Sequence, residues 1–125
     1  MKIVLVLLLA LAASSAQNAP EREGNFNIRF EPAAKLQTGA AVPFEITVTD
    51  ALHKPLTQAK TTLQIGMVDG TNVKVFRAPE VDRIARPGIY IAKPVFPASG
   101  EYNIYVEVHR ADQMSARTIQ FTIPE

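Results

Sequence analysis

The feature that most constrains this chain is the alternation of apolar and polar side chains with a period of two residues. Its clearest instance is the stretch 102–109, in which Tyr, Ile, Val and Val alternate with polar residues such as Asn103 and Glu107. Successive side chains of a β-strand point to opposite faces, so this pattern predicts a strand with one buried face. Strand patterns also occupy residues 26–30, 44–49, 59–67, 73–75, 89–92 and 117–123.

Turn residues separate these stretches at short intervals. Thr38-Gly39, Asp69-Gly70, Pro87-Gly88 and Ser99-Gly100 are all pairs that tight turns favour. About seven antiparallel strands with no amphipathic helix predict an all-β, immunoglobulin-like β-sandwich with Greek-key connections, and a small barrel is the alternative. Tyr102 follows the last turn, as in the tyrosine corner of Greek-key sandwiches, which favours the sandwich.

The N-terminus has the pattern of a secretory signal peptide. A short charged start precedes an apolar run over residues 3–13, and small residues follow up to Ala16. The run is shorter than the roughly 20 residues needed to span a bilayer. We therefore expect a cleaved signal peptide (1–16), a flexible lead-in (17–24) and one domain (25–125), exported to the periplasm or the exterior, with no membrane span in the mature chain.

Composition excludes several classes of function. The chain has no Cys, which removes disulfides, thiolate metal sites and Cys nucleophiles. Its 13 basic residues nearly balance its 12 acidic ones, so nucleic-acid binding is not expected. Phosphate-binding loops and the Gly-x-Ser-x-Gly nucleophile motif are absent from the sequence, and the carboxylates show no paired arrangement. We therefore expect a protein that is not an enzyme.

Short motifs along the chain suggest a family. They are Phe30-Glu31-Pro32, Gly39, residues 44–50, Lys54-Pro55-Leu56, Ala59, Pro87-Gly88-Ile89-Tyr90 and Ser99-Gly100-Glu101-Tyr102. In these motifs the chain resembles the YtkA-like family of exported bacterial immunoglobulin-like domains, which is related to the FixH-like and copper-resistance sandwich proteins. The resemblance implies a role in copper handling or respiratory-oxidase assembly. Metal-linked members of that group are rich in Met and His around the middle strands, whereas residues 65–72 of this chain hold one Met and no His.

Copper(I) prefers converging Met and His donors, and few are present here. The candidates are Met67, His109 and Met114. The alternation places Met67 on a core face and His109 on a solvent face, while Met114 is expected in a turn over residues 110–115. Two neighbouring donors make a weak site, so the preferred interpretation includes no cofactor, with copper as the alternative.

A mixed stretch from Lys74 to Arg86 contains the candidate interaction residues. Phe76, Arg77, Arg83 and Arg86 are of the types favoured at protein interfaces. The alternative is a charged connecting loop. The sequence thus predicts a monomeric, non-catalytic binding or accessory module that recognises an envelope protein. A periplasmic copper-binding accessory protein is the alternative.

Overall fold

The computed structural model describes residues 25–125, and the expected signal peptide and lead-in lie outside them. The described part is all-β and contains eight strands. They are β1 (Asn27–Pro32), β2 (Phe44–Thr49), β3 (Lys60–Met67), β4 (Lys74–Arg77), β5 (Glu80–Asp82), β6 (Arg86–Ala92), β7 (Gly100–Arg110) and β8 (Gln113–Ile123). No helix of residues 25–125 has the length and apolarity that crossing a membrane requires.

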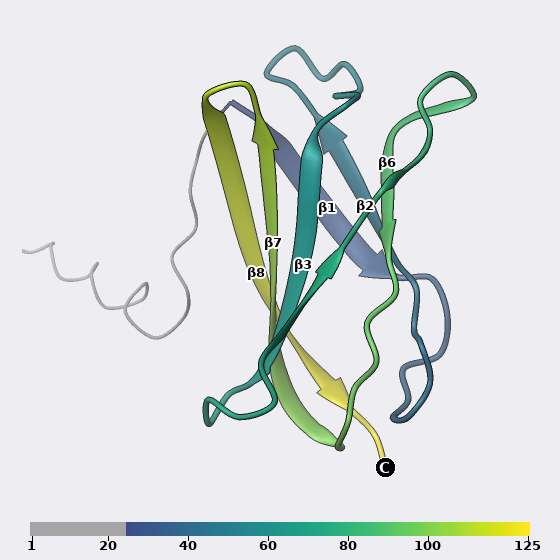
Figure 1. Cartoon of the computed structure of the whole chain (residues 1–125), viewed down its shortest axis with the longest axis vertical. Helices are drawn as coiled ribbons and strands as arrows, with labels where there is room; N and C mark the ends of the chain where they lie inside the picture. Colours follow the sequence, from purple (N-terminus) through teal and green to yellow (C-terminus); the bar gives the residue numbers. More distant parts are fainter. Residues whose placement is uncertain (1–24) are drawn as a thin grey trace, which may run out of the picture.

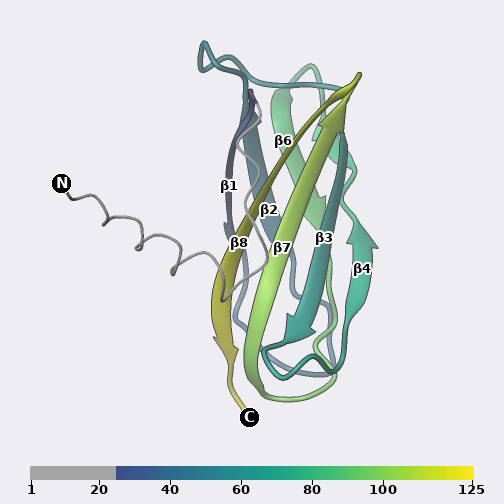
Figure 2. The same cartoon turned by 90° about the vertical axis from the view of Figure 1, so that its left-hand side faces the viewer.

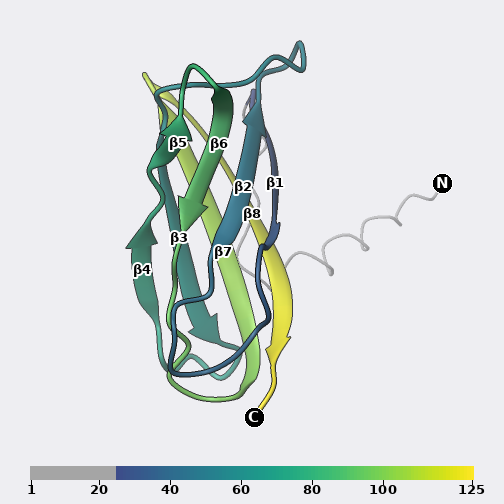
Figure 3. The ribbon, with the colours of Figure 1, turned by 90° about the vertical axis from the view of Figure 1, so that its right-hand side faces the viewer.

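The strands form two antiparallel sheets of four. The first has the order β1-β2-β6-β5 and the second the order β4-β3-β7-β8. The two sheets lie in separate layers when the molecule is seen from its sides (Figures 2 and 3). The strand β1 begins at one end of these layers, and the C-terminus lies at the opposite end (Figure 1).

The core lies between the two sheets and follows the alternation of the sequence. On β7 the four alternating residues from Tyr102 to Val108 are all fully buried, and on β2 the same is true of Phe44, Ile46 and Val48. The rings of Phe44 and Phe121 lie 5.4 Å apart in an edge-to-face contact between the two sheets. Burial of these side chains is the main source of stability in a chain without disulfides.

Two buried tyrosines fix connections between strands. The Tyr102 hydroxyl donates a hydrogen bond to the Ala98 carbonyl (2.7 Å) and accepts one from the Ala98 N–H (3.3 Å). The Tyr90 hydroxyl donates to the Leu56 carbonyl (2.7 Å) and accepts from the Ala59 N–H (3.0 Å). Tyr90 thereby anchors the segment that carries the chain from β2 in one sheet to β3 in the other.

The strand β6 requires a glycine two residues before Tyr90. Gly88 has a φ of +78°, and a Cβ at this position would lie 2.8 Å from the Val48 carbonyl oxygen. A side chain here would therefore meet both backbone strain and the neighbouring strand β2.

The hairpin of β7 and β8 pairs eleven residues of each strand. Beside it, Glu101 accepts hydrogen bonds from Gln120 Nε2 (2.7 Å) and Thr122 Oγ1 (2.9 Å), both on β8. These two bonds lower the pKa of the Glu101 carboxyl, the one from Gln120 having the larger effect.

Three details differ from the sequence prediction. There are eight strands and not seven. The additional strand is β5, only three residues long, which forms within the stretch between Lys74 and Arg86. The strand β6 begins at Arg86, since it pairs with Asp82 across a tight turn. Met114 lies within β8 and not in a turn. Arg110 already pairs with Gln113, so only the two residues between them form the β7–β8 turn.

Candidate interaction surface

The hairpin that joins β3 to β4 forms at the predicted Asp69-Gly70 turn. Gly70 has a φ of +92°, and the Asp69 carboxylate accepts hydrogen bonds from the hydroxyl (2.6 Å) and the N–H (3.0 Å) of Thr71. The hydroxyl bond is the main reason why the pKa of Asp69 lies below its usual value. This network holds the hairpin in place and positions β4 at the edge of its sheet.

Three valines of this hairpin are exposed, and we call them the hairpin patch. Val68, Val73 and Val75 keep 54%, 56% and 55% of their surface accessible. Val73 lies over Gly66 of β3, whose absent Cβ would come within 3.2 Å of the Val73 side chain. The patch thus occupies the outer face of the second sheet, beside the free edge of β4.

The remaining side chains of β4 are aromatic and basic. Phe76 pairs with Leu63 of β3 and its ring packs against the core, so it is partly buried. The Lys74 ammonium lies 5.6 Å from the centre of the Phe76 ring. Arg77 is exposed on the same side of the sheet as Val75. Of the two predicted interaction residues on β4, Arg77 is therefore at the surface, whereas Phe76 packs against the core.

Arg83 lies in the turn between β5 and β6, and Arg86 begins β6 in the other sheet. The turn between β5 and β6 is held by the Asp82 carboxylate, which accepts hydrogen bonds from two backbone N–H groups of the turn. Arg86 forms a salt bridge with Glu45 of β2 (2.6 Å). β4 and β5 follow one another along one side of the molecule (Figure 3), whereas Arg86 of β6 reaches Glu45 of β2, so the four predicted residues form no single cluster.

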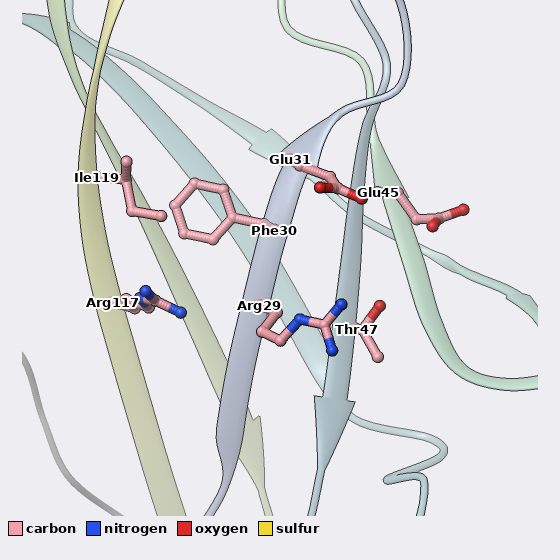
Figure 4. Close-up of a pocket in the computed structure, with 7 residues that line it drawn as sticks. All are labelled: Arg29, Phe30, Glu31, Glu45, Thr47, Arg117 and Ile119. Atoms are coloured by element: carbon pink, nitrogen blue, oxygen red, sulfur yellow. The ribbon is translucent and has the colours of Figure 1, made fainter.

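A groove of about 310 Å³ crosses the edge of β1 on the opposite side. It is lined by Arg29, Phe30, Glu31, Glu45, Thr47, Arg117 and Ile119 (Figure 4). The Arg117 guanidinium donates a hydrogen bond to the Ile28 carbonyl (2.8 Å) and so already satisfies part of the β1 edge. Two arginines and two glutamates line the groove, so its charge favours no single class of ligand.

The structure places two of the three predicted copper donors together. His109 of β7 lies directly opposite Met114 of β8, and His109 Nε2 lies 3.1 Å from Glu107 Oε1. On β3, Lys60 is the residue that pairs with His109, and Met67 lies seven residues further along the strand, where it pairs with Tyr102. That spacing puts Met67 about 23 Å away and on the other face of the sheet.

Other metal-binding groups are not assembled in the described residues. Between residues 25 and 125, no three His, Asp or Glu side chains are arranged to hold a metal ion. The Met67 sulfur accepts a hydrogen bond from the Asn72 amide (3.1 Å).

The hairpin patch was missed by the sequence analysis, although a signal for it existed. Residues that flank an inward-facing side chain on a strand face outward, and Val75 precedes Phe76, which packs inward.

Comparison with protein-family models gives no match, and comparison with curated proteins gives none either.

Proposed function

We propose that this protein is an exported, non-catalytic binding module that recognises an envelope protein through the β3–β4 hairpin and the free edge of β4. The observation that carries the proposal is the hairpin patch, because exposed valines beside a strand with one open edge are the kind of surface that a protein partner covers. Export is expected from the signal-peptide pattern of residues 1–16.

We further propose that the fold is immunoglobulin-like and related to the YtkA-like domains. In immunoglobulin-like domains, strands A, B, E and D form one sheet and C, F and G form the other. The order β1-β2-β6-β5 corresponds to the first of these sheets, and β3-β7-β8, extended by β4, corresponds to the second. The Tyr102 hydroxyl bond near the start of β7 supports the same assignment.

Site-specific photo-crosslinking in the producing cell tests the proposed function. A benzophenone side chain at position 75 is expected to give one discrete adduct with an envelope protein. The same group at position 122, an exposed site on β8, is the matched control and should give none. The partner is then purified, and Val73→Asp should weaken its binding to this protein, whereas Thr122→Asp should not. Equal crosslinking from both positions, or none from position 75, would refute the proposal.

A copper-binding accessory role is the second candidate, and the opposed pair His109 and Met114 favours it. A copper(I) titration against a competing chelator tests it. Binding should be lost in His109→Ala and Met114→Leu and kept in Met67→Leu, because Met67 lies far from the pair. A titration no stronger than the chelator background would exclude the role, and equal binding in all variants would exclude His109 and Met114 as its site.

A further inference from the structure

The backbone of β4 presents unpaired hydrogen-bonding groups on its outer edge. The Ala78 N–H donates to the Thr61 carbonyl (2.9 Å), which makes this a hydrogen-bonded pair of the β3–β4 ladder. Hydrogen-bonded and non-hydrogen-bonded pairs alternate in an antiparallel ladder. The N–H and carbonyl groups of Val75 and Arg77 therefore point away from β3. Within residues 25–125, β4 has β3 as its sole neighbouring strand.

The charge along this edge has one sign. β4 reads Lys74, Val75, Phe76 and Arg77, with a cation at each end and no acidic residue. In the described part of the chain, neither Lys74 nor Arg77 forms a salt bridge. The edge thus offers two cations that are free to pair with a partner.

Directly opposed side chains determine which strand pairs best with β4. Opposite charges and apolar pairs stabilise neighbouring strands, and like charges destabilise them. The best partner therefore has acidic residues opposite Lys74 and Arg77, and apolar residues opposite Val75 and Phe76. This order, acidic–apolar–apolar–acidic, reads the same in both directions and so does not depend on the orientation of the added strand.

We propose that β4 binds an extended acidic–apolar–apolar–acidic segment of its protein partner as an added fifth strand of the β4-β3-β7-β8 sheet. This inference rests on the proposed function and names the chemistry that it recognises. A second copy of the chain does not fit, because pairing β4 with itself places Lys74 opposite Arg77 or each cation opposite its own copy. The segment is about four residues long, since the chain leaves the sheet after Ala78 to form β5 in the other one.

An NMR titration of the purified protein tests the inference. The probe is an end-capped peptide with the central sequence glutamate-valine-valine-glutamate, and the control is the peptide in which lysine replaces both glutamates. The acidic peptide is expected to give saturable shifts of the Val75 and Arg77 amide protons, while the basic peptide gives none.

Two sets of variants separate the added strand from a nonspecific attraction. Val75→Pro removes one outward N–H, and proline is tolerated at such an edge position. Its affinity for the acidic peptide should fall roughly tenfold, the value of one net hydrogen bond. Lys74→Glu with Arg77→Glu should reverse the preference in favour of the basic peptide. Lys35→Glu with Lys93→Glu, which makes the same change in net charge at other exposed sites, should leave the preference unchanged.

The outcomes distinguish this inference from the proposed function. Equal binding of both peptides, or reversal of the preference by the Lys35 and Lys93 control, would overturn the added strand. If position 75 crosslinks to a partner but the acidic peptide does not bind, the partner recognises the sheet face, so the inference is wrong and the proposed function stands. If Val75→Pro does not fold, as judged by circular dichroism, the charge-reversal variants alone decide.

Discussion

Removing the Tyr90 hydroxyl should destabilise the protein more than removing the Tyr102 hydroxyl. Both rings are fully buried, so Tyr→Phe keeps the packing and deletes one oxygen atom. At Tyr90 that oxygen bonds two different residues, Leu56 and Ala59, which lie more than thirty positions away in the sequence. At Tyr102 it bonds the backbone of Ala98 alone, four residues away.

The expected magnitudes follow from what each substitution leaves unpaired. Tyr90→Phe leaves the carbonyl of the buried Leu56 and the N–H of the half-buried Ala59 without their partner, which should lower the free energy of unfolding by about 2–3 kcal/mol. Tyr102→Phe should lower it by about 1–2 kcal/mol, because the Ala98 backbone is half-buried and water can replace the hydroxyl.

The pH dependence provides an independent check on Tyr90. Burial, as the largest cause, raises the pKa of Tyr90 above its ordinary value of 10.0. An unfolded tyrosine therefore loses its proton at a lower pH than folded Tyr90 does. The stability associated with the neutral hydroxyl is present below pH 10 and decreases as the pH rises above it. The difference between wild type and Tyr90→Phe should accordingly shrink above pH 10.

Urea unfolding followed by far-UV circular dichroism measures these differences, because the loss of the backbone signal of the sheets reports unfolding in all three proteins. The wild type and both variants are compared at neutral pH and again above pH 10. The reasoning is wrong if Tyr102→Phe costs more than Tyr90→Phe, or if the cost of Tyr90→Phe stays constant across that pH range.

Three further predictions concern single positions. Gly88→Ala should lower the free energy of unfolding by more than Gly39→Ala does. Gly39 has a similar φ of +80°, but no atom lies within 4 Å of an added Cβ there, so Gly39→Ala should cost about 1 kcal/mol. Equal costs of the two substitutions in urea unfolding would contradict the steric argument. Hydrogen bonds lower the pKa of Glu101, so the stability that its carboxylate provides is present above the unfolded pKa and is lost as the pH falls below about 4. Glu101→Gln should therefore flatten the loss of stability in acid titrations, and an unchanged acid profile would contradict this prediction. Arg117→Met should lower the free energy of unfolding by about 1–2 kcal/mol and speed amide hydrogen exchange along β1, because the Ile28 carbonyl loses its donor. Unchanged exchange along β1 would show that water replaces the guanidinium.

Strand positions were predictable where one face of a strand is buried along its whole length. On β7, four alternating side chains from Tyr102 to Val108 face the core, so the periodicity of the sequence and the burial coincide. The signal was weaker from Lys74 to Arg86: residues 73–75 predicted part of β4, whereas β5 has only three residues, too few for a period to appear. Both strands pair with their neighbours in the sequence, β3 and β6, and it is this pairing that identifies them.

The candidate site was harder to predict than the strands, because it depends on register. The parity of Met67 and His109 along their strands already placed them on different faces. Their separation along the sheet became clear only from the pairing of β3 with β7. The exposed edge of β4 could not be inferred either, since which strand lies at an edge is a property of the sheet order.

The positions of β1 and of the C-terminus at opposite ends of the layers have a mechanical consequence (Figure 1). A force applied between the two ends of the described chain acts along β1 and β8, parallel to the strands. Such a force shears the six paired residues of β1 against β2 and the eleven of β8 against β7, so that the hydrogen bonds of each ladder are loaded together. A module attached at both ends should therefore resist extension better than a hairpin of the same length that is peeled open one pair at a time.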